Sequence, residues 1–169
     1  MKFILIMTLL FSLTACWPTS VSFNDTGSLP PEWKQFSLIN LENTAPNSPI
    51  NFSGYLSDKI RDGIQNNTRL KLSSTPNSGE VRIEGNITNY VITPIAIQAG
   101  DNVSKNRLTV TCNIKINITS PKEQEMSITS TRFSDFPTDK NFSEVETQLN
   151  ELISEQIVQD VINKILSNW

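Results

Sequence analysis

The segment RLTVTCNIKINIT, residues 107–119, alternates between apolar and polar side chains without a break. Because successive side chains of a β-strand point to opposite faces of its sheet, the alternation predicts a strand with one face covered and the other in water. Cys112 falls among the apolar positions, so we expect a core residue without a redox role. The covered positions are Leu108, Val110, Cys112, Ile114, Ile116 and Ile118, and the open ones are Thr109, Thr111, Asn113, Lys115, Asn117 and Thr119.

Weaker alternation on both sides of this segment predicts two more strands. The first alternates over residues 81–88 and loses its phase after Asn89, with Gly85 as the expected site of a β-bulge and Pro94 as a strand end or edge. The second follows a turn at residues 120–123, SPKE, and runs over residues 126–136. Together the three strands predict an antiparallel meander.

Two apolar stripes at helical spacing predict two helices whose stripes pack on a core. The first helix is expected over residues 49–66, with Ser48 as its cap and Pro49 as its first residue. The second is expected to begin at a capping box formed by Ser143 and Glu146. The stripes consist of Phe52, Leu56, Ile60 and Ile64 in the first helix, and of Leu149, Leu152, Ile153, Ile157, Val161, Ile165 and Trp169 in the second.

The remaining segments complete a two-layer fold. Residues 36–41, FSLINL, are too apolar to have a wet face and predict a buried strand, while residues 69–72 are compatible with the start of another. The order is then β-α-β-β-β-α, and a right-handed crossover should make the first two strands parallel. Both helices must hide their stripes on one sheet face. We therefore predict an α+β two-layer sandwich, with two helices on one face of a four-stranded mixed sheet.

The N-terminus has the anatomy of an exported lipoprotein. A single positive charge precedes an apolar run that is too short to span a bilayer permanently, and the run ends in LTAC, residues 13–16. This spacing is typical of a bacterial lipobox, in which lipid is attached to the cysteine thiol and the chain is cut just before it. The alternative is an ordinary signal peptide with a chance cysteine, which would leave a Cys16–Cys112 disulfide open. The expected divisions are residues 1–15 as a lipoprotein signal peptide, residues 16–28 as a tether that begins at lipidated Cys16, and residues 29–169 as the folded domain.

Composition narrows the function. The 169 residues carry 14 basic and 17 acidic side chains without a basic block, so nucleic acid is not an expected partner. The chain has no histidine, and we find no nucleophile, phosphate-loop or zinc motif in it. Asp135 and Asp139 flank Pro137 in what we interpret as a turn, where paired carboxylates are usually solvated. We therefore expect no enzymatic activity, no metal site and no cofactor.

Three parts of the sequence carry a resemblance to a known family. They are SLPPEWKQFSLINLENTAP (residues 28–46), VITPIAIQAGD with SKNRLTV (91–101 and 104–110) and VINKILSNW (161–169). With the lipobox and the order of elements, they resemble the LptE-type lipopolysaccharide-assembly lipoproteins of the Gram-negative outer membrane. No single motif is diagnostic, but the combination covers nearly the whole chain. The resemblance implies two helices on a four-stranded sheet, the fold that the residue pattern also predicts.

The resemblance also implies a function. Proteins of this type sit inside the large outer-membrane β-barrel that inserts lipopolysaccharide (an LptD-like protein), plug it, help it to fold and bind lipopolysaccharide. This chain would then be lipid-anchored at the outer membrane, face the periplasm and lie partly within the barrel. The family's lipopolysaccharide contacts are basic residues near one end of the sheet. Candidates here are Lys105 and Arg107, in the loop before the central strand, and Arg132, with solvated surface charges as the alternative. The competing function is a generic lipid-anchored structural or interaction subunit of another envelope complex.

Overall fold

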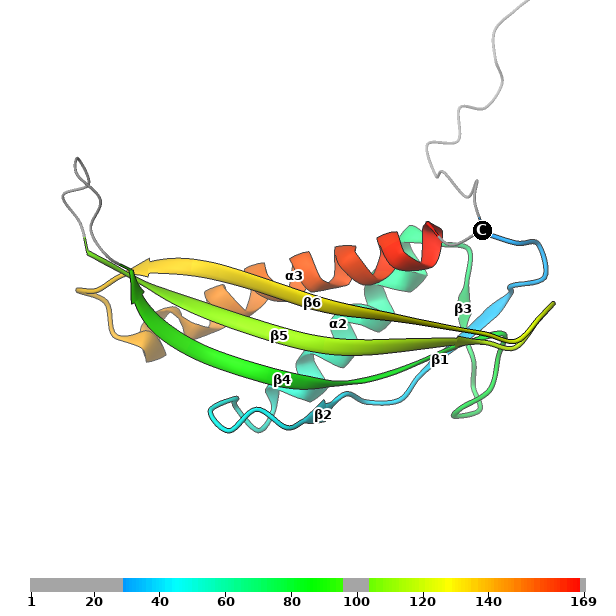
Figure 1. Ribbon diagram of the computed structural model, residues 1–169, viewed down its shortest axis with the longest axis horizontal. Helices are drawn as coiled ribbons and strands as arrows, with labels where there is room; N and C mark the ends of the chain where they lie inside the picture. The colour runs from blue at the N-terminus through cyan, green and yellow to red at the C-terminus, as the bar shows by residue number, and fades with distance from the viewer. Residues whose placement is uncertain (1–28, 96–103, 168–169) are drawn as a thin grey trace, which may run out of the picture.

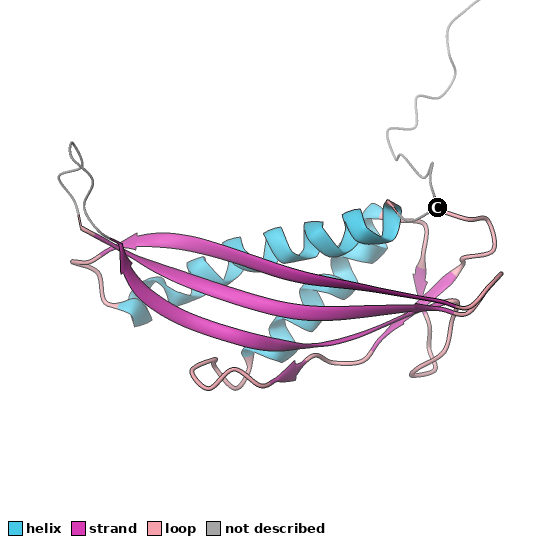
Figure 2. Ribbon diagram, in the orientation of Figure 1, coloured by secondary structure: helices cyan, strands magenta, loops and turns pink. Residues whose placement is uncertain are grey.

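A computed structural model of the chain describes residues 29–95 and 104–167. One mixed β-sheet and two helices form two layers, and both helices lie on the same face of the sheet (Figures 1 and 2). The expected signal peptide, the tether with Cys16, and Trp169 lie outside the described residues. The elements in chain order are β1 (Gln35–Leu38), β2 (Glu42–Asn43), α2 (Phe52–Asn67), β3 (Lys71–Leu72), β4 (Val81–Ile95), β5 (Lys105–Ile118), β6 (Gln124–Pro137) and α3 (Phe142–Leu166).

Three long antiparallel strands form most of the sheet, as the alternation predicts. β5 pairs with β4 on one side and with β6 on the other. Its apolar positions, from Leu108 to Ile118, are all buried on the side that the helices cover. Their polar neighbours alternate with them along the strand and therefore point to the opposite face. The predicted meander and the predicted faces of residues 107–119 are therefore confirmed.

Within the described residues, the sheet contains six strands and not the predicted four. Its path is β3-β1-β4-β5-β6, with β2 also paired to β4, and the predicted parallel pairing of β1 with β4 is confirmed. The single strand predicted over residues 36–41 divides because the chain turns inward at Leu41. The Leu41 side chain is buried, and its backbone N–H donates to the Ser57 hydroxyl of α2 at 2.9 Å rather than to β4. Parallel pairing with β4 resumes only at β2.

The bulge in β4 lies at Thr88, not at Gly85 as predicted. The pairing of β4 with β5 skips Thr88, which makes it the extra residue of the bulge. Gly85 is instead a position of close approach. A Cβ atom there would lie 2.3 Å from the backbone oxygen of Asn113 and 3.2 Å from the side chain of Leu41. The absent side chain of Gly85 leaves the space that Leu41 fills on the covered face.

The predicted stripe of the first helix is confirmed, but the helix begins later than expected. Phe52, the first residue of α2, donates its backbone N–H to the Pro49 carbonyl at 3.0 Å, so Pro49 belongs to the turn before the helix. Ser48 is not a cap, because its hydroxyl is buried with no hydrogen-bond partner among the described residues. Further along, Gly63 lets the Val158 side chain of α3 approach the α2 backbone.

The second helix also has most of its predicted stripe and a different start. The residue before α3 is Asn141, whose amide donates to the Glu144 carboxylate at 3.1 Å, so the expected capping box of Ser143 and Glu146 is wrong. Leu152 is 42% exposed and therefore not a core residue, because it lies beside the stripe rather than on it. The buried stripe residues of α3 are Leu149, Ile153, Ile157, Val161 and Ile165.

Cys112 lies inside the core, as predicted. Its side chain is buried and is a free thiol in the part of the chain that the structure describes. Burial raises the pKa of this thiol to about 12. The thiolate is the reactive form of cysteine, so Cys112 is protonated and inert at neutral pH.

We predict that a maleimide labels Cys112 only after unfolding, once Cys16 is acylated or replaced by serine; mass spectrometry measures the labelling. Cys112→Asp should lower the free energy of unfolding by about 3–5 kcal/mol, because it places an unpaired carboxylate in the core. The matched change Cys112→Val, which keeps the site apolar, should cost less than about 1.5 kcal/mol. Rapid labelling of the folded protein would contradict the assignment of faces.

Candidate functional site on the open face of the sheet

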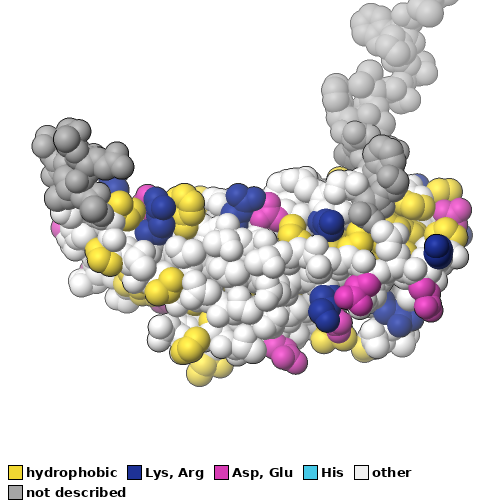
Figure 3. All heavy atoms as spheres, in the orientation of Figure 1, with side chains coloured by type: hydrophobic (Ala, Val, Ile, Leu, Met, Phe, Trp, Pro, Cys, Tyr) yellow, Lys and Arg dark blue, Asp and Glu magenta, His cyan; other side chains and the backbone are white. Residues whose placement is uncertain are grey.

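The open face of the sheet, which points away from both helices, is a broad polar surface. Figure 3 views this face, and side chains that are neither charged nor apolar dominate its middle. Charged side chains gather toward its ends (Figure 3). The central part, which we call the Thr/Asn face, consists of Asn86 and Asn89 from β4, Thr109, Thr111 and Asn113 from β5, and Thr129 and Thr131 from β6.

Cross-strand hydrogen bonds order the Thr/Asn face. The hydroxyls of Thr111 and Thr131 lie 3.1 Å apart, and Thr129 donates to the amide oxygen of Asn113 at 2.9 Å. Each pair joins residues that are directly opposite in the β5–β6 register. Such pairs stabilise a sheet and restrict the side chains that form them. The face therefore presents hydroxyl and amide groups in fixed positions, suited to hydrogen bonding with a polar partner.

The predicted residues Lys105 and Arg107 lie at one end of the open face, and both belong to β5 rather than to the loop before it. The Arg107 guanidinium binds the Asp135 carboxylate of β6 through two hydrogen bonds, of 2.7 and 2.9 Å. It also lies 3.7 Å from the centre of the Phe133 ring. Asp135 is therefore not the solvated turn residue that we expected.

Hydrogen bonding sets the charges of this pair. The Arg107 hydrogen bonds hold the pKa of the Asp135 carboxyl below its usual value, with a further contribution from the charge of Lys105. The same contact raises the pKa of Arg107. Both groups are therefore charged at neutral pH, and much of the Arg107 charge is compensated within the protein.

Arg132, the third predicted residue, lies on the other face of the sheet. Its guanidinium binds the Asp160 carboxylate of α3, with a distance of 2.7 Å from Nε to Oδ2, and the Ser130 hydroxyl donates to the same oxygen at 2.5 Å. Burial opposes the ionisation of Asp160, but the hydrogen bonds from Arg132 and Ser130 outweigh it, so the pKa of Asp160 is lowered. The contact joins the edge strand β6 to α3. The structure thus brings Lys105 and Arg107 together and separates Arg132 from them.

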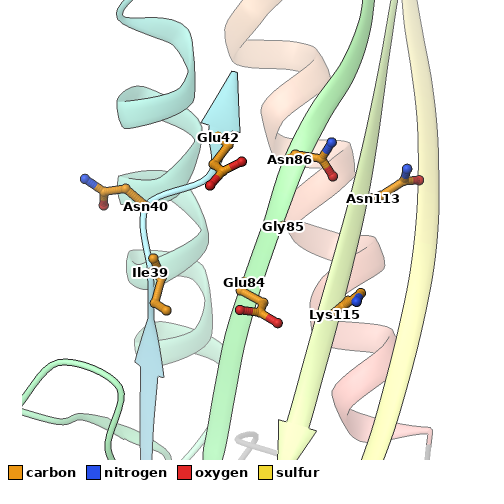
Figure 4. A pocket seen from close by; sticks show the side chains of 8 residues that line it. All are labelled: Ile39, Asn40, Glu42, Glu84, Gly85, Asn86, Asn113 and Lys115. Carbon is orange, nitrogen blue, oxygen red and sulfur yellow. The ribbon is translucent and has the colours of Figure 1, made fainter. Parts of the chain in front are cut away.

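A shallow depression of about 350 Å³ interrupts the open face where the chain leaves β1 and joins β2 (Figure 4). Glu42, Glu84 and Lys115 line it, and Lys115 is opposite Glu84 in the β4–β5 register. Mixed charges of this kind favour no ligand of a single sign. The depression is otherwise lined by Ile39, Asn40, Gly85, Asn86 and Asn113.

Two absences concern residues 29–95 and 104–167, the part of the chain that the structure describes. Across these ranges, no group of three or more His, Cys, Asp or Glu side chains is placed to hold a metal ion. None of the helices in these ranges is both long enough and apolar enough to cross a membrane.

The acidic partners of the two arginines were not predicted from the sequence. The alternation of β6 would have placed Arg132 on the covered face, unlike Arg107 on the open face. Arg132 is an even number of residues from Met126 and Phe136, the covered positions of its strand. Asp160 left no comparable signal. It belongs to a helix, and only the packing of that helix on β6 shows which strand residue it meets.

The fold matches solved structures of other chains. The structure of the hypothetical protein CT253 from Chlamydia trachomatis has a TM-score of 0.55 at 11% identity, over 80% of this chain and 99% of that chain. Uncharacterized lipoprotein B from Nitrosomonas europaea has a TM-score of 0.52 at 15% identity, over 89% of this chain and 92% of that chain. These identities establish a shared fold alone. They define the class as α+β domains in which two helices cover one face of a mixed sheet.

A family model identifies the chain more closely. Residues 34–167 match the model of the LptE family, described as lipopolysaccharide-assembly. Because the match spans most of the chain, the protein belongs to the LptE family of lipopolysaccharide-assembly lipoproteins, which are membrane-associated and non-catalytic. This family match confirms the resemblance seen in the sequence. A comparison with curated proteins finds no match.

We predict that Asp160→Asn lowers the free energy of unfolding by about 1–2 kcal/mol at pH 7, because Arg132 and Ser130 lose a charged acceptor. The pKa of Asp160 is lower in the folded state than in the unfolded state. Its contribution is therefore fully present above the unfolded pKa of about 3.9 and is lost as the pH falls through the folded pKa. Urea unfolding at several pH values should show the difference between wild type and variant shrinking below about pH 4.

Asp135→Asn is the matched control for this prediction, because it removes an arginine partner from the exposed face instead. We expect a smaller loss of stability from it, since solvent screens the exposed pair. An Asp160→Asn variant as stable as wild type at pH 7 would show that the contact between β6 and α3 does not stabilise the fold.

Proposed function

We propose that this protein is an outer-membrane lipoprotein that plugs the β-barrel inserting lipopolysaccharide, helps that barrel to assemble and binds lipopolysaccharide. Membership of the LptE family supports the place in lipopolysaccharide assembly. The observation that carries the finer proposal is the Thr/Asn face. A generic lipid-anchored subunit of another envelope complex remains the alternative, with the same face turned to a different partner.

The chemistry of the Thr/Asn face fits the inside of a barrel. The interior of an outer-membrane barrel is polar, so a plug needs a polar surface that hydrogen-bonds to it. Neutral hydroxyl and amide groups lose less than ionised groups when water is removed, provided that the partner supplies hydrogen bonds. Because cross-strand contacts such as that between Thr129 and Asn113 already order these groups, binding costs them little rotamer freedom.

The proposed anchor complements this surface. Cleavage after residue 15 and acylation of Cys16 would leave residues 16–28 as a tether to the domain at residues 29–169. A fully extended tether of this length reaches at most about 45 Å. The lipid would keep the domain at the periplasmic side of the outer membrane, while the folded surface selects the partner.

The proposed glycolipid contacts differ in how accessible their charges are. Lys105 and Arg107 are side by side in space on the open face, where lipid A phosphates would have to share Arg107 with Asp135. Arg132 is a weaker candidate, because its contact with Asp160 on the helix-covered face would first have to open. Asp135 is therefore expected to limit affinity for phosphate.

We predict that a variant beginning at Thr19, exported without a lipid, still co-isolates with the barrel when the two are co-expressed in the envelope. Its yield should fall only because the tether raises the effective concentration. Thr129→Arg, which places an unpaired charge in the middle of the Thr/Asn face, should abolish co-isolation. Gln148→Arg, on the exposed side of α3, is the matched control and should leave it unchanged. If the untethered domain captures no barrel at any expression level, the plug hypothesis fails and the generic subunit takes its place.

We predict that reversing Lys105 and Arg107 to glutamate weakens lipopolysaccharide binding and leaves the barrel complex intact, because contacts to phosphate are local. Asp135→Asn should have the opposite effect and strengthen binding, since it frees the charge of Arg107. Binding of the purified variants to immobilised lipopolysaccharide measures both. Unchanged binding in the reversed variant would leave these residues as ordinary surface charges.

A further inference from the structure

A basic groove lies at the end of the domain where the described chain begins. Its volume is about 440 Å³, and Lys34, Arg69 and Lys71 line it together with Pro31, Trp33 and Gln35. The three cations come from different segments: Lys34 precedes β1, Arg69 follows α2 and Lys71 belongs to β3. All three side chains are exposed. We call this feature the anchor-end groove.

The positive charge of the anchor-end groove is only partly compensated. Within the described residues, none of its three cations forms a salt bridge with a carboxylate. Arg69 donates instead to neutral backbone carbonyls, that of Leu29 at 2.6 Å and that of Pro30. Glu80 is the acidic side chain at its edge. The Glu80 carboxylate accepts hydrogen bonds from the backbone N–H groups of Lys34 and Gln35, at 3.1 and 2.7 Å.

The hydrogen bonds of Arg69 place the groove where the proposed tether joins the domain. Arg69 holds Leu29, the residue at which the proposed tether of residues 16–28 joins the domain. Trp33 fixes the following segment by donating from Nε1 to the Ser120 carbonyl at 2.7 Å. Figure 1 shows that this first segment, β1 and β3 all lie at one end of the molecule. Because the tether joins the domain at this end, the attachment point favours this end, rather than the far end of the long strands, as the one nearer the bilayer.

We propose that the anchor-end groove is a second membrane contact, which binds the phosphates of anionic phospholipid headgroups in the leaflet that holds the anchor. Ammonium and guanidinium groups form charge-assisted hydrogen bonds with phosphate. Each basic residue near an anionic surface strengthens association by roughly fivefold. The net charge of −3 for the whole chain makes such a local excess of positive charge decisive for orientation. The inference rests on the proposed lipid anchor at Cys16.

The test measures which end of the acylated protein approaches the membrane. The full chain is reconstituted into phosphatidylcholine vesicles with or without phosphatidylglycerol. A fluorophore is placed on Thr75→Cys, in the loop that follows β3 at this end of the domain, or on Asp139→Cys, beyond the far end of β6. Buried Cys112 and acylated Cys16 stay unlabelled. Energy transfer to a headgroup-labelled lipid should rise for position 75, and not for position 139, when phosphatidylglycerol is present. Added salt should remove the rise, because it screens the attraction.

Charge reversals in the groove decide the outcome. The pair Lys34→Glu and Lys71→Glu should abolish the rise, whereas Lys115→Glu with Lys140→Glu changes the net charge equally and should preserve it. Thermal melting of both variants checks that they fold. The proposal is overturned by equal transfer in the two kinds of vesicle, or by equal effects of the two pairs. Removal of the rise by inorganic phosphate at constant ionic strength, or a rise only in vesicles that contain lipopolysaccharide, would overturn it in favour of a phosphate or glycolipid site.

A failure of the groove proposal can be distinguished from a failure of the proposed lipid anchor at Cys16. Mass spectrometry of the reconstituted protein detects the acyl chains on Cys16, and their absence contradicts the proposed anchor alone. Flotation of the unacylated chain with anionic vesicles then measures the groove directly, and the reversed pair should reduce its partitioning by at least about 25-fold, because two attractions are lost and two repulsions added. Because no barrel is present in either assay, neither result bears on the plug.

Discussion

The two-residue alternation of β5 is the constraint on which the rest of the structure depends. β5 lies between β4 and β6, and its covered side chains pack against the apolar stripes of α2 and α3. A shift of one residue in the pairing of β5 would expose these apolar side chains to water and bury the Thr/Asn face instead. The bulge at Thr88 and the close approach at Gly85 adjust β4 to this register without changing which face of β5 is covered.

The same alternation separates residues that fasten the fold from residues that are available to a partner. Arg107 and Arg132 are similar side chains on paired strands, and each binds an aspartate in two hydrogen bonds. Arg107 occupies an open position of its strand and faces water, whereas Arg132 occupies a covered position and joins β6 to α3. Substitutions on the open face should therefore have little effect on the core, because the open and the covered side chains are connected only through the backbone of the strands.

Sequence alone predicts the elements of this molecule whose apolar residues recur at a regular spacing. The long strands, the two helices and the covered residues of β5 follow from periodicity, and so does the presence of Lys105 and Arg107 near one another. The short strand β2 does not, because the break before it depends on the contact between Leu41 and Ser57. β3 lies within residues 69–72, a segment that the sequence already marks as compatible with a strand. The helix starts depend on single turn hydrogen bonds.

The ion pairs and the anchor-end groove are hidden for the same reason. Their members are far apart along the chain, so no local window contains them. Lys34, Arg69 and Lys71 become one surface only after β1 and β3 pair in parallel, with Gln35 opposite Lys71. The fold is thus largely predictable from the sequence, and so are the β5 positions of the Thr/Asn face and the pair Lys105 and Arg107. The acidic partners of the arginines and the anchor-end groove are not.

The strands also separate two positively charged features. The anchor-end groove lies beside β1 and β3, next to the β4–β5 pairs that end at Ile118, while Lys105 begins β5 at the opposite end. The 14 residues of β5 span about 45 Å at the usual rise of a strand. That length exceeds the hydrocarbon core of a bilayer, which is about 30 Å thick. In the proposed arrangement, a domain held by one end at the periplasmic leaflet is long enough to bring Lys105 and Arg107 through the barrel to the far side of the membrane. The uncharged Thr/Asn face between the two ends would then line the route, where a polar wall needs hydrogen bonds and not charge.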